Sequence, residues 1–381
     1  MDWMLSCAAC GATDRPDGLK TVCQCGQPWL VRYPDRSWSR LTPDALGSGP
    51  GMWRYRAFLP LTGSESPVSL GEGTTPLLAI PRAGADLGAG HLWVKDEGVN
   101  PTGSFKARGL AAAITRASLA GAKRFTLPTA GNAGVAASAY AARAGLPVRV
   151  YAPDSTPTTI LSQIRWFGGD LVLLPGHIGD CGKASRQFAA EHDATDLSTL
   201  REPYRIEGKK TLGLEIAEQF GWTLPDVILY PTGGGTGLIG MWKAFRELID
   251  AGWVAGPAPR LFSVQSDGCA PVVRAFAAGK SSAEPWPDPW TVASGLRVPG
   301  PLGDRLMLGA LRETKGGAIA VSDADLSEAA ARYSRLEGLD LSPEGGATFA
   351  ALRHLLATGQ VARDERIVLF NTGAGWLYRG A

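Results

Sequence analysis

Short apolar runs alternate with amphipathic stretches from about Leu92 to the end of the chain. The runs "KRFTLP" (123–128), "PVRVYAP" (147–153), "DLVLLP" (170–175) and "RIVLFN" (366–371) are typical of strands. Each of the first three runs is followed by a segment whose pattern favours a helix, at residues 133–145, 156–168 and 182–192. Continuous apolar strands are expected in parallel sheets that are covered on both faces. The alternation therefore predicts an α/β fold with mostly parallel sheets and right-handed crossovers.

The composition is that of a globular protein without marked charge. Its 381 residues are 45% hydrophobic, which is enough for two domains with buried cores. The formal net charge of +2 is spread along the chain, which argues against nucleic-acid binding. Apolar stretches stop short of bilayer-spanning length, and the first residues lack the basic and apolar regions of a signal peptide. We expect a cytoplasmic protein that acts on a small molecule and binds neither nucleic acid nor a membrane.

Four of the six cysteines lie near the N-terminus as Cys7, Cys10, Cys23 and Cys25. In a cytoplasmic chain this spacing favours a metal-binding knuckle over disulfides. Zinc would be held by four thiolates and would be structural, because no coordination position stays open. The second pair has one intervening residue where zinc ribbons usually have two, so a knuckle that only packs is the alternative.

A glycine-rich segment follows the apolar run "DVILYP" and precedes a predicted helix. Consecutive glycines let several backbone N–H groups point at one anion, and the helix N-terminus favours its negative charge. No Gly-Lys-Ser/Thr sequence follows, so this is not a Walker loop. We predict a phosphate cradle formed by Gly233, Gly234, Gly235, Thr236 and Gly237; a turn without a ligand is the alternative.

Lys106 stands at the start of an alanine-rich predicted helix whose expected N-cap is Ser104. The helix dipole and burial both disfavour the ammonium form there. A lysine kept partly neutral is a nucleophile for carbonyl groups, with which it forms an imine. Alone, a solvated lysine would be the simpler interpretation, but beside a phosphate cradle Lys106 indicates pyridoxal 5′-phosphate (PLP). A third loop offers the Asn132 amide to a ring oxygen, although an asparagine in such a turn often only adopts a left-handed conformation.

Six sequence blocks then resemble one family. They are "GEGTTPL" (71–77), "KDEGVNPTGSFKARG" (95–109), "IEGKKTLGLEIAEQ" (206–219), "PTGGGTGLIGMWKAF" (231–245), "SGLRVPGPLGDRL" (294–306) and "LFNTGAG" (369–375). In this order they resemble the fold-type II PLP enzymes, which are similar to the tryptophan synthase β subunit, and within them threonine synthase and its paralogues. The resemblance implies that Lys106 forms the Schiff base, that Asn132 contacts the phenolic oxygen, that Gly233 to Gly237 hold the phosphate, and that Thr372 faces the pyridine nitrogen.

The resemblance also implies a domain organisation. We expect a Cys-rich knuckle over residues 1–28 and a smaller domain over 93–205 that carries the lysine. A larger domain, formed by 29–92 and 206–381, would hold the cofactor phosphate. Both main domains would contain parallel sheets with the cofactor between them. Relatives are commonly homodimers, so we expect a homodimer.

The implied reaction is that of a carbon–oxygen lyase acting on a phosphate ester, converting O-phospho-L-homoserine and water into L-threonine and phosphate. Basic residues are needed for the substrate phosphate, and the candidates are Arg165, Arg205, Lys209 and Lys210. Thr129, Ala130 and Gly131 are candidates for binding the rest of the substrate. Relatives commonly carry hydroxyl residues at the positions of Ala130 and Ala133, which leaves the substrate open.

Three other functions stay open on the sequence. A threonine or serine dehydratase would share the lysine and the cradle and release a 2-oxo acid. A paralogue similar to cysteate synthase would replace the phosphate of phosphoserine. A regulatory protein built on a retired enzyme is the third, although the intact Lys106 and phosphate loop speak against it.

Overall fold

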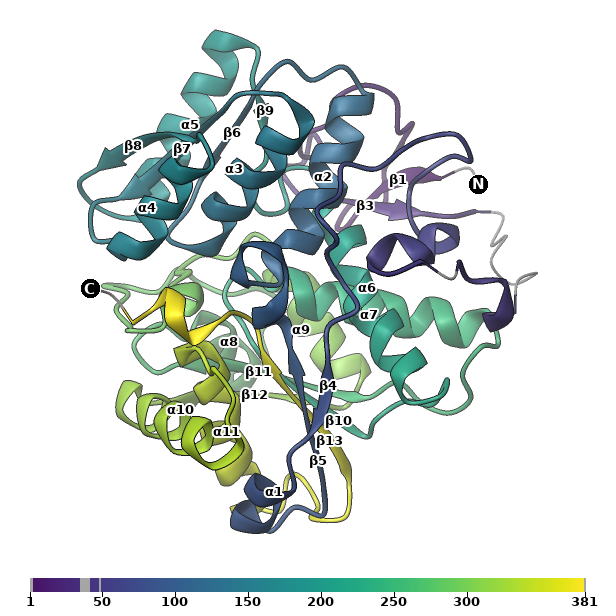
Figure 1. Ribbon diagram of the computed structural model, residues 1–381, viewed down its shortest axis with the longest axis vertical. Coiled ribbons are helices and arrows are strands. Elements are labelled where there is room, and N and C mark those ends of the chain that lie inside the picture. The colour runs from purple at the N-terminus through teal and green to yellow at the C-terminus, as the bar shows by residue number, and fades with distance from the viewer. Residues whose placement is uncertain (1–2, 35–41, 48, 380–381) are drawn as a thin grey trace.

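The computed structural model describes residues 3–34, 42–47 and 49–379, and it contains two mostly parallel sheets. The smaller sheet is entirely parallel, in the order β8 (Asp170–Leu174), β7 (Val148–Pro153), β6 (Phe125–Pro128) and β9 (Thr195–Asp196). Helices α2 (Lys106–Leu119), α3 (Asn132–Ala144), α4 (Thr158–Trp166) and α5 (Ile178–His192) accompany it. This half of the molecule is the upper half in Figure 1.

The larger sheet has six strands and lies in the lower half of Figure 1. Its order is β12 (Gly317–Val321), β11 (Arg260–Ser266), β10 (Val227–Pro231), β13 (Arg366–Asn371), β5 (His91–Asp96) and β4 (Leu77–Ala79). Only β4, at the edge, is antiparallel to its neighbour. The remaining helices are α1 (Pro81–Leu87), α6 (Arg205–Gln219), α7 (Thr236–Asp250), α8 (Pro271–Ala277), α9 (Asp304–Glu313), α10 (Asp323–Glu337) and α11 (Pro343–Ala357).

Both faces of the larger sheet are buried, as its continuous apolar strands predict. In β10, Val227 and Leu229 join a core that includes Phe349 and Leu352 of α11. The alternate residues, Ile228 and Tyr230, join a second core with side chains of α7 and α9. Because successive side chains of a strand point to opposite faces, one five-residue strand supports both cores.

The N-terminal Cys-rich knuckle is a three-stranded antiparallel sheet in the order β2 (Thr13–Asp14), β1 (Met4–Cys7) and β3 (Trp29–Arg32). It packs through Trp29 and Val31 on a core that contains Leu214 of α6 and Leu248 of α7. The knuckle therefore extends beyond residue 28, because β3 completes its sheet.

The structure differs from the sequence expectations at three places. Residues 93–96, which we expected in the smaller domain, form part of the larger sheet, because β5 pairs in parallel with β13. Helix α2 has Phe105 as its N-cap, because Ser104 is extended and bridges to Gly373. Helix α5 begins at Ile178, four residues earlier than its sequence pattern indicates, because His177 and Asp180 form a capping box there.

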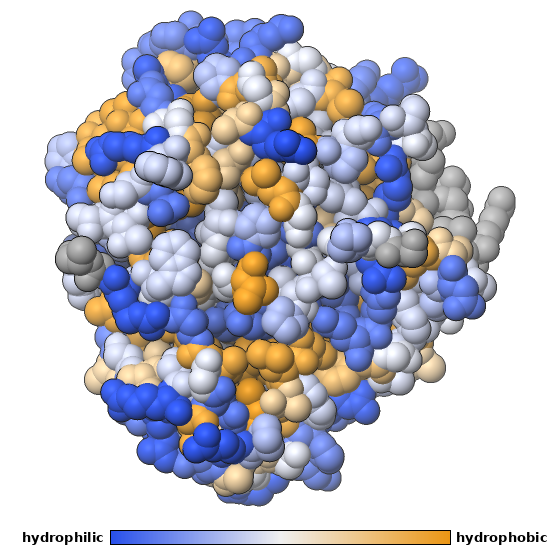
Figure 2. Space-filling model, in the orientation of Figure 1, coloured by the Kyte–Doolittle hydropathy of each residue, from blue (hydrophilic) through white to orange (hydrophobic). Residues whose placement is uncertain are grey.

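Polar residues cover much of the face shown in Figure 2, and apolar residues gather below its centre. Among the described residues, no helix is long and apolar enough to cross a membrane.

Candidate active site

Lys106 is the first residue of α2, a helix of the upper half of Figure 1 that packs against α6 through Gly109. The turn before it places Thr102 at φ 66° and Gly103 at φ 69°, in the left-handed region. A β-branched residue is strained in this conformation, and such strain is frequent at functional sites. A Cβ atom on Gly103 would also lie only 3.0 Å from the Leu377 side chain. The turn is thus held by its surroundings and fixes where the lysine starts.

The lysine loop is hydrogen-bonded to the loop that follows β13. The Phe105 N–H donates to the Thr372 carbonyl at 3.1 Å, and the Ala374 N–H donates to the Gly103 carbonyl at 2.8 Å. Lys106 and Thr372, which are far apart in sequence, are therefore brought together as the resemblance requires.

Burial, together with the nearby Arg205 guanidinium, lowers the pKa of the Lys106 amine to about 7, although the Glu344 carboxyl acts in the opposite direction. The Lys106 Nζ also lies 4.5 Å from the centre of the Phe105 ring. A large fraction of this amine is therefore neutral near pH 7, which is what a nucleophile for a carbonyl group needs.

The Asn132 loop connects β6 to α3. The Thr129 hydroxyl accepts hydrogen bonds from the Gly131 and Gly134 N–H groups, both at 3.1 Å, so Thr129 shapes the turn. The Asn132 Nδ2 donates to the Tyr378 hydroxyl at 3.2 Å, whereas its Oδ1 is buried without a hydrogen-bond partner. Buried polar atoms nearly always have a partner, so this amide is available to a ligand.

The glycine-rich loop joins β10 to α7 and needs its glycines for packing. A Cβ atom on Gly233 would collide with the Gly295 carbonyl, and one on Gly237 with the Tyr230 hydroxyl. Gly235 has φ 74° and lies against Met307. The loop runs directly into the N-terminus of the 15-residue helix α7 at Thr236. This is the strand–loop–helix arrangement in which backbone N–H groups bind phosphate.

Three further polar side chains gather near Asn132, and the sequence prediction missed them as site residues. Glu344, in the first turn of α11, accepts from the Gly295 N–H at 2.7 Å, and burial raises its pKa. Burial and the facing Glu344 carboxyl raise the pKa of Tyr378. The Ser294 hydroxyl is buried without a partner and lies beside Gly131. Only the tertiary fold brings these segments together, so no local sequence signal identifies them.

Two of the four basic candidates lie near Lys106. Lys209 is fully buried, donates to the Phe105 carbonyl, and lies 3.8 Å from the Phe105 ring centre; burial and the Lys106 charge lower its pKa. Arg205 is 2% exposed, donates to the Leu197 carbonyl at 2.7 Å, and has an Nε without a partner. Within the described ranges, no carboxylate lies within ion-pair distance of either side chain.

The other two candidates lie elsewhere. Lys210 forms ion pairs with Glu207 at 2.7 Å and with Glu247 at 2.8 Å, on the side of α6 that faces the knuckle. Arg165 is an exposed residue in the last turn of α4. The structure brings neither of them to Lys106.

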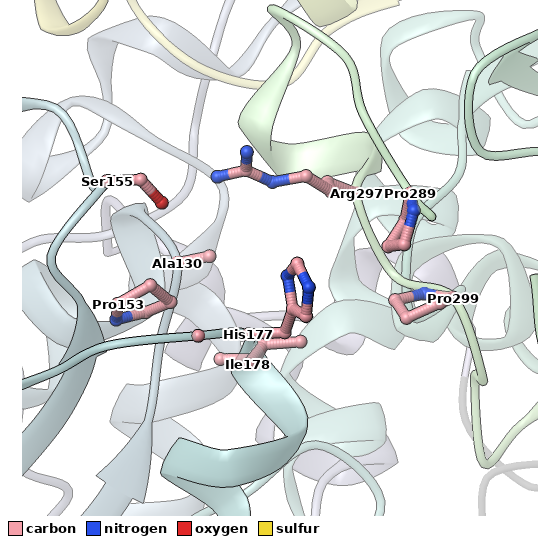
Figure 3. Close-up of a pocket in the computed structure, with 9 residues that line it drawn as sticks. Ala130, Pro153, Ser155, His177, Ile178, Pro289, Arg297 and Pro299 are labelled. Atoms are coloured by element: carbon pink, nitrogen blue, oxygen red, sulfur yellow. The ribbon is translucent and has the colours of Figure 1, made fainter. Parts of the chain in front are cut away.

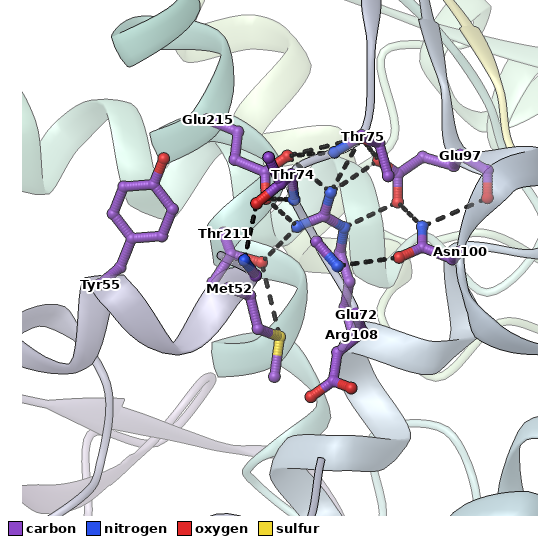
Figure 4. Close-up of polar contacts among 12 residues, drawn as sticks. Met52, Tyr55, Glu72, Thr74, Thr75, Glu97, Asn100, Arg108, Thr211 and Glu215 are labelled. Carbon is purple, nitrogen blue, oxygen red and sulfur yellow. Dashed lines mark hydrogen bonds and ion pairs between the residues drawn. The ribbon is translucent and has the colours of Figure 1, made fainter. Parts of the chain in front are cut away.

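A buried ionic network holds the lysine helix in place (Figure 4). The Arg108 guanidinium lies between Glu97 and Glu215, with four N···O distances of 2.7–2.8 Å. It also donates to the hydroxyls of Thr75 and Thr211. These partners come from the β5 end, the segment before β4, and α6, so Arg108 ties α2 to the rest of the molecule two residues after Lys106.

The four knuckle cysteines lie together, with all four Sγ atoms within 4.8 Å of one another. The Cys7 and Cys25 sulfurs are 3.4 Å apart, and the Cys10 and Cys23 sulfurs are 3.7 Å apart. Four thiolates at Zn–S distances of about 2.3 Å would be separated by about 3.8 Å in a tetrahedron. The donor set and its spacing therefore fit a zinc ion.

Comparisons with known proteins agree with this geometry. The family model described as pyridoxal-phosphate dependent enzyme matches residues 68–373. A threonine synthase of Methanocaldococcus jannaschii is 33% identical over 97% of this chain and 91% of its own length, and one of Mycobacterium bovis is 34% identical over 84% and 86%. Among solved structures, maize serine racemase has a TM-score of 0.69 at 22% identity, covering 79% of this chain and 88% of its own. Threonine deaminase isoform 2 of Solanum lycopersicum has a TM-score of 0.68 at 19% identity, and the match covers 86% of this chain and 92% of the deaminase chain. These two structures show the fold alone.

Proposed function

Because the chain belongs to the threonine synthase family of pyridoxal-phosphate dependent enzymes, we propose that it converts O-phospho-L-homoserine and water into L-threonine and phosphate. The family implies PLP, and the residues fit it. The buried amide oxygen of Asn132 and the buried hydroxyl of Ser294 lack partners, and a glycine cradle opens α7.

In this proposal Lys106 attaches the cofactor covalently, and the loop from Gly233 to Gly237 binds its phosphate. Asn132 contacts its ring oxygen, and Thr372 faces its ring nitrogen. When bound, PLP withdraws electrons from the amino acid and makes its α-proton acidic. Once the substrate amino group has replaced it on the cofactor, the freed Lys106 amine would take and return protons at the substrate carbons, because one rigidly placed base can reach adjacent atoms.

The observation that carries the proposal is the buried, unpaired Arg205. A guanidinium that is 2% exposed and lacks an ion-pair partner among the described residues is costly unless a ligand supplies an anion. Burial lowers the pKa of Arg205, and the nearby carboxylates of Glu202 and Asp196 act in the raising direction. Neither carboxylate lies within ion-pair distance of the guanidinium, and Glu202 accepts from the Tyr204 and Arg205 backbone N–H groups. Serine and threonine carry no second anion, whereas O-phosphohomoserine does. Arg205, with Lys209 behind it, therefore supports a phosphorylated substrate over that of a dehydratase.

The test is to incubate the purified protein with O-phospho-L-homoserine and quantify phosphate, threonine and 2-oxobutyrate together. We expect phosphate and threonine in equal amounts and none with Lys106→Ala. Release of 2-oxobutyrate instead of threonine would indicate a lyase that stops after elimination. Turnover of O-phosphoserine but not of O-phosphohomoserine would indicate the β-replacement reaction.

Two further proposals concern the rest of the chain. The knuckle would hold one structural zinc ion through Cys7, Cys10, Cys23 and Cys25, because the four sulfurs have the spacing that this ion needs. We also expect the enzyme to be a cytoplasmic homodimer, as the sequence resemblance implies, and light scattering of the purified protein tests its mass.

A further inference from the structure

A groove opens between the two main domains beside the Asn132 loop (Figure 3). Ala130, Ser155 and His177 line it from the smaller domain, and Arg297 lines it from the larger one, with Pro289 and Pro299 at its edge. In Figure 3 the Arg297 side chain extends across the groove toward Ser155, above Ala130 and the His177 ring. No carboxylate is among the residues that line this groove.

The segment that carries Arg297 is anchored at both ends of its loop. The Trp286 N–H donates to the Pro299 carbonyl at 2.9 Å, and the Gly295 N–H donates to Glu344 at 2.7 Å. Gly295 also packs on Gly233 of the phosphate cradle. Arg297 therefore lies two residues after Gly295, which contacts the predicted phosphate cradle of the cofactor.

The Arg297 guanidinium has no hydrogen bond or ion pair with any side chain that the structure describes, and lies 5.4 Å from the centre of the Trp290 ring. The side chain is half-buried. Its surroundings are a serine hydroxyl, an imidazole, and apolar alanine and proline surfaces. Apolar walls strengthen the attraction between a guanidinium and an anion, because they exclude water from part of the contact.

The location of the groove beside the Asn132 loop indicates which anion Arg297 binds; this step rests on the proposed function. The substrate's amino group must reach the cofactor near Lys106 and Asn132, and its carboxylate is bonded to the carbon that bears this amino group. The carboxylate must therefore lie close to the Asn132 loop, whereas the phosphate lies at the far end of the substrate. Ala130 belongs to this loop and to the groove. We propose that the groove is an anion subsite in which Arg297 binds the α-carboxylate of the amino-acid substrate.

Two fragments of the substrate separate this role from phosphate binding. L-Homoserine has the carboxylate without the phosphate, and 3-aminopropyl phosphate has the phosphate without the carboxylate. We would measure the inhibition constants of both with the holoenzyme for the wild type, Arg297→Met, Arg297→Lys and Arg305→Met. Arg305 is an exposed arginine of α9 and serves as the matched control for loss of a surface charge.

We expect Arg297→Met to weaken homoserine binding by about 10- to 100-fold, which is the effect of losing one charge-assisted hydrogen bond. Binding of 3-aminopropyl phosphate should change by less than about twofold in the same variant, which also shows that the site is intact. Arg297→Lys should be intermediate, because an ammonium keeps the charge and loses the bidentate geometry. Guanidinium ion added to Arg297→Met should restore part of the homoserine affinity, and Arg305→Met should match the wild type.

Equal homoserine binding by the wild type and Arg297→Met would overturn the subsite. Selective loss of 3-aminopropyl phosphate would overturn the carboxylate assignment and move Arg297 to the phosphate. A wild type that binds neither fragment and makes no threonine would overturn the proposed function, and this inference with it.

Discussion

Replacing Arg108 with methionine should lower the free energy of unfolding by an amount near the upper end of the range that is typical for breaking a buried ion pair. Arg108, Glu97 and Glu215 are 0–3% exposed, and Arg108 is the centre of their contacts. The substitution leaves Glu215 with Lys95, at 2.9 Å, but leaves Glu97 with only the Asn100 amide and the Thr75 hydroxyl. Breaking a buried pair from one side costs about 3–5 kcal/mol. Because both carboxylates lose the guanidinium and Glu97 keeps no cationic partner within ion-pair distance, we expect a loss of about 5 kcal/mol at pH 7.5.

The loss should also depend on pH. Burial alone would raise the pKa of Glu97, but Arg108 holds it below its ordinary value. In the wild type this carboxylate therefore adds stability above its unfolded pKa, and the contribution is lost as the pH falls through the folded pKa. In Arg108→Met burial prevails and the folded pKa lies above the unfolded one, so the variant loses stability as the pH rises. The difference between the two proteins should be smaller at pH 5 than at pH 7.5.

Denaturant unfolding followed by circular dichroism at both pH values measures these differences. The control is Arg332→Met, which removes a half-exposed arginine that pairs with Asp86 and should cost less than about 1 kcal/mol. The triple change Arg108→Met, Glu97→Gln, Glu215→Gln should recover part of the loss, because it removes the unpaired charges. A loss below about 1 kcal/mol at pH 7.5, or one that does not vary with pH, would refute the view that buried charges hold the lysine helix.

Four other outcomes follow from the site. Arg205→Met should raise the KM for O-phosphohomoserine about 10- to 100-fold, whereas Arg165→Met should leave it unchanged, which steady-state kinetics can show. Uptake of PLP by the apoprotein, followed by absorbance, should increase as the pH rises through about 7, because the neutral Lys106 amine is required; Arg205→Met should shift this midpoint upward. Tyr378→Phe should weaken PLP binding about 3- to 10-fold, because the Asn132 Nδ2 loses its acceptor. Metal analysis should find about one zinc per chain, and its removal by a chelator should lower the melting temperature; a Cys10→Ser variant that keeps full zinc would contradict the tetrathiolate.

The sequence predicts the strands and the loops of the site because their signals are local. β6, β7 and β8 lie within one or two residues of their apolar runs, and the loops of Lys106, Asn132 and Gly233 each occupy a junction that sequence alone marks. Glycine-rich and proline-containing turns, and a lysine at the start of a helix, can be recognised in the sequence without knowledge of the fold. Glu344, Tyr378 and Arg297 carry no such mark, because their roles depend on which distant segment each one faces.

Helix α6 shows why the remaining site residues could not be assigned from sequence. Lys209 and Lys210 are adjacent, yet residues of a helix are separated by about 100° around its axis. Arg205 and Lys209 are four residues apart and lie on the face toward Gly109 of α2, where within the described chain neither has a carboxylate within ion-pair distance. Glu207 and Lys210 are three residues apart and lie on the face toward the knuckle, where Tyr33 donates to Glu207 at 2.7 Å and Lys243 pairs with it. Both faces are buried, so hydrophobic periodicity does not distinguish them, and only the packing of α6 between α2 and the knuckle decides which lysine faces a ligand. The same helix thus joins the cations of the candidate site to the knuckle by a rigid element, so a change in the knuckle that moves α6 would also move Arg205.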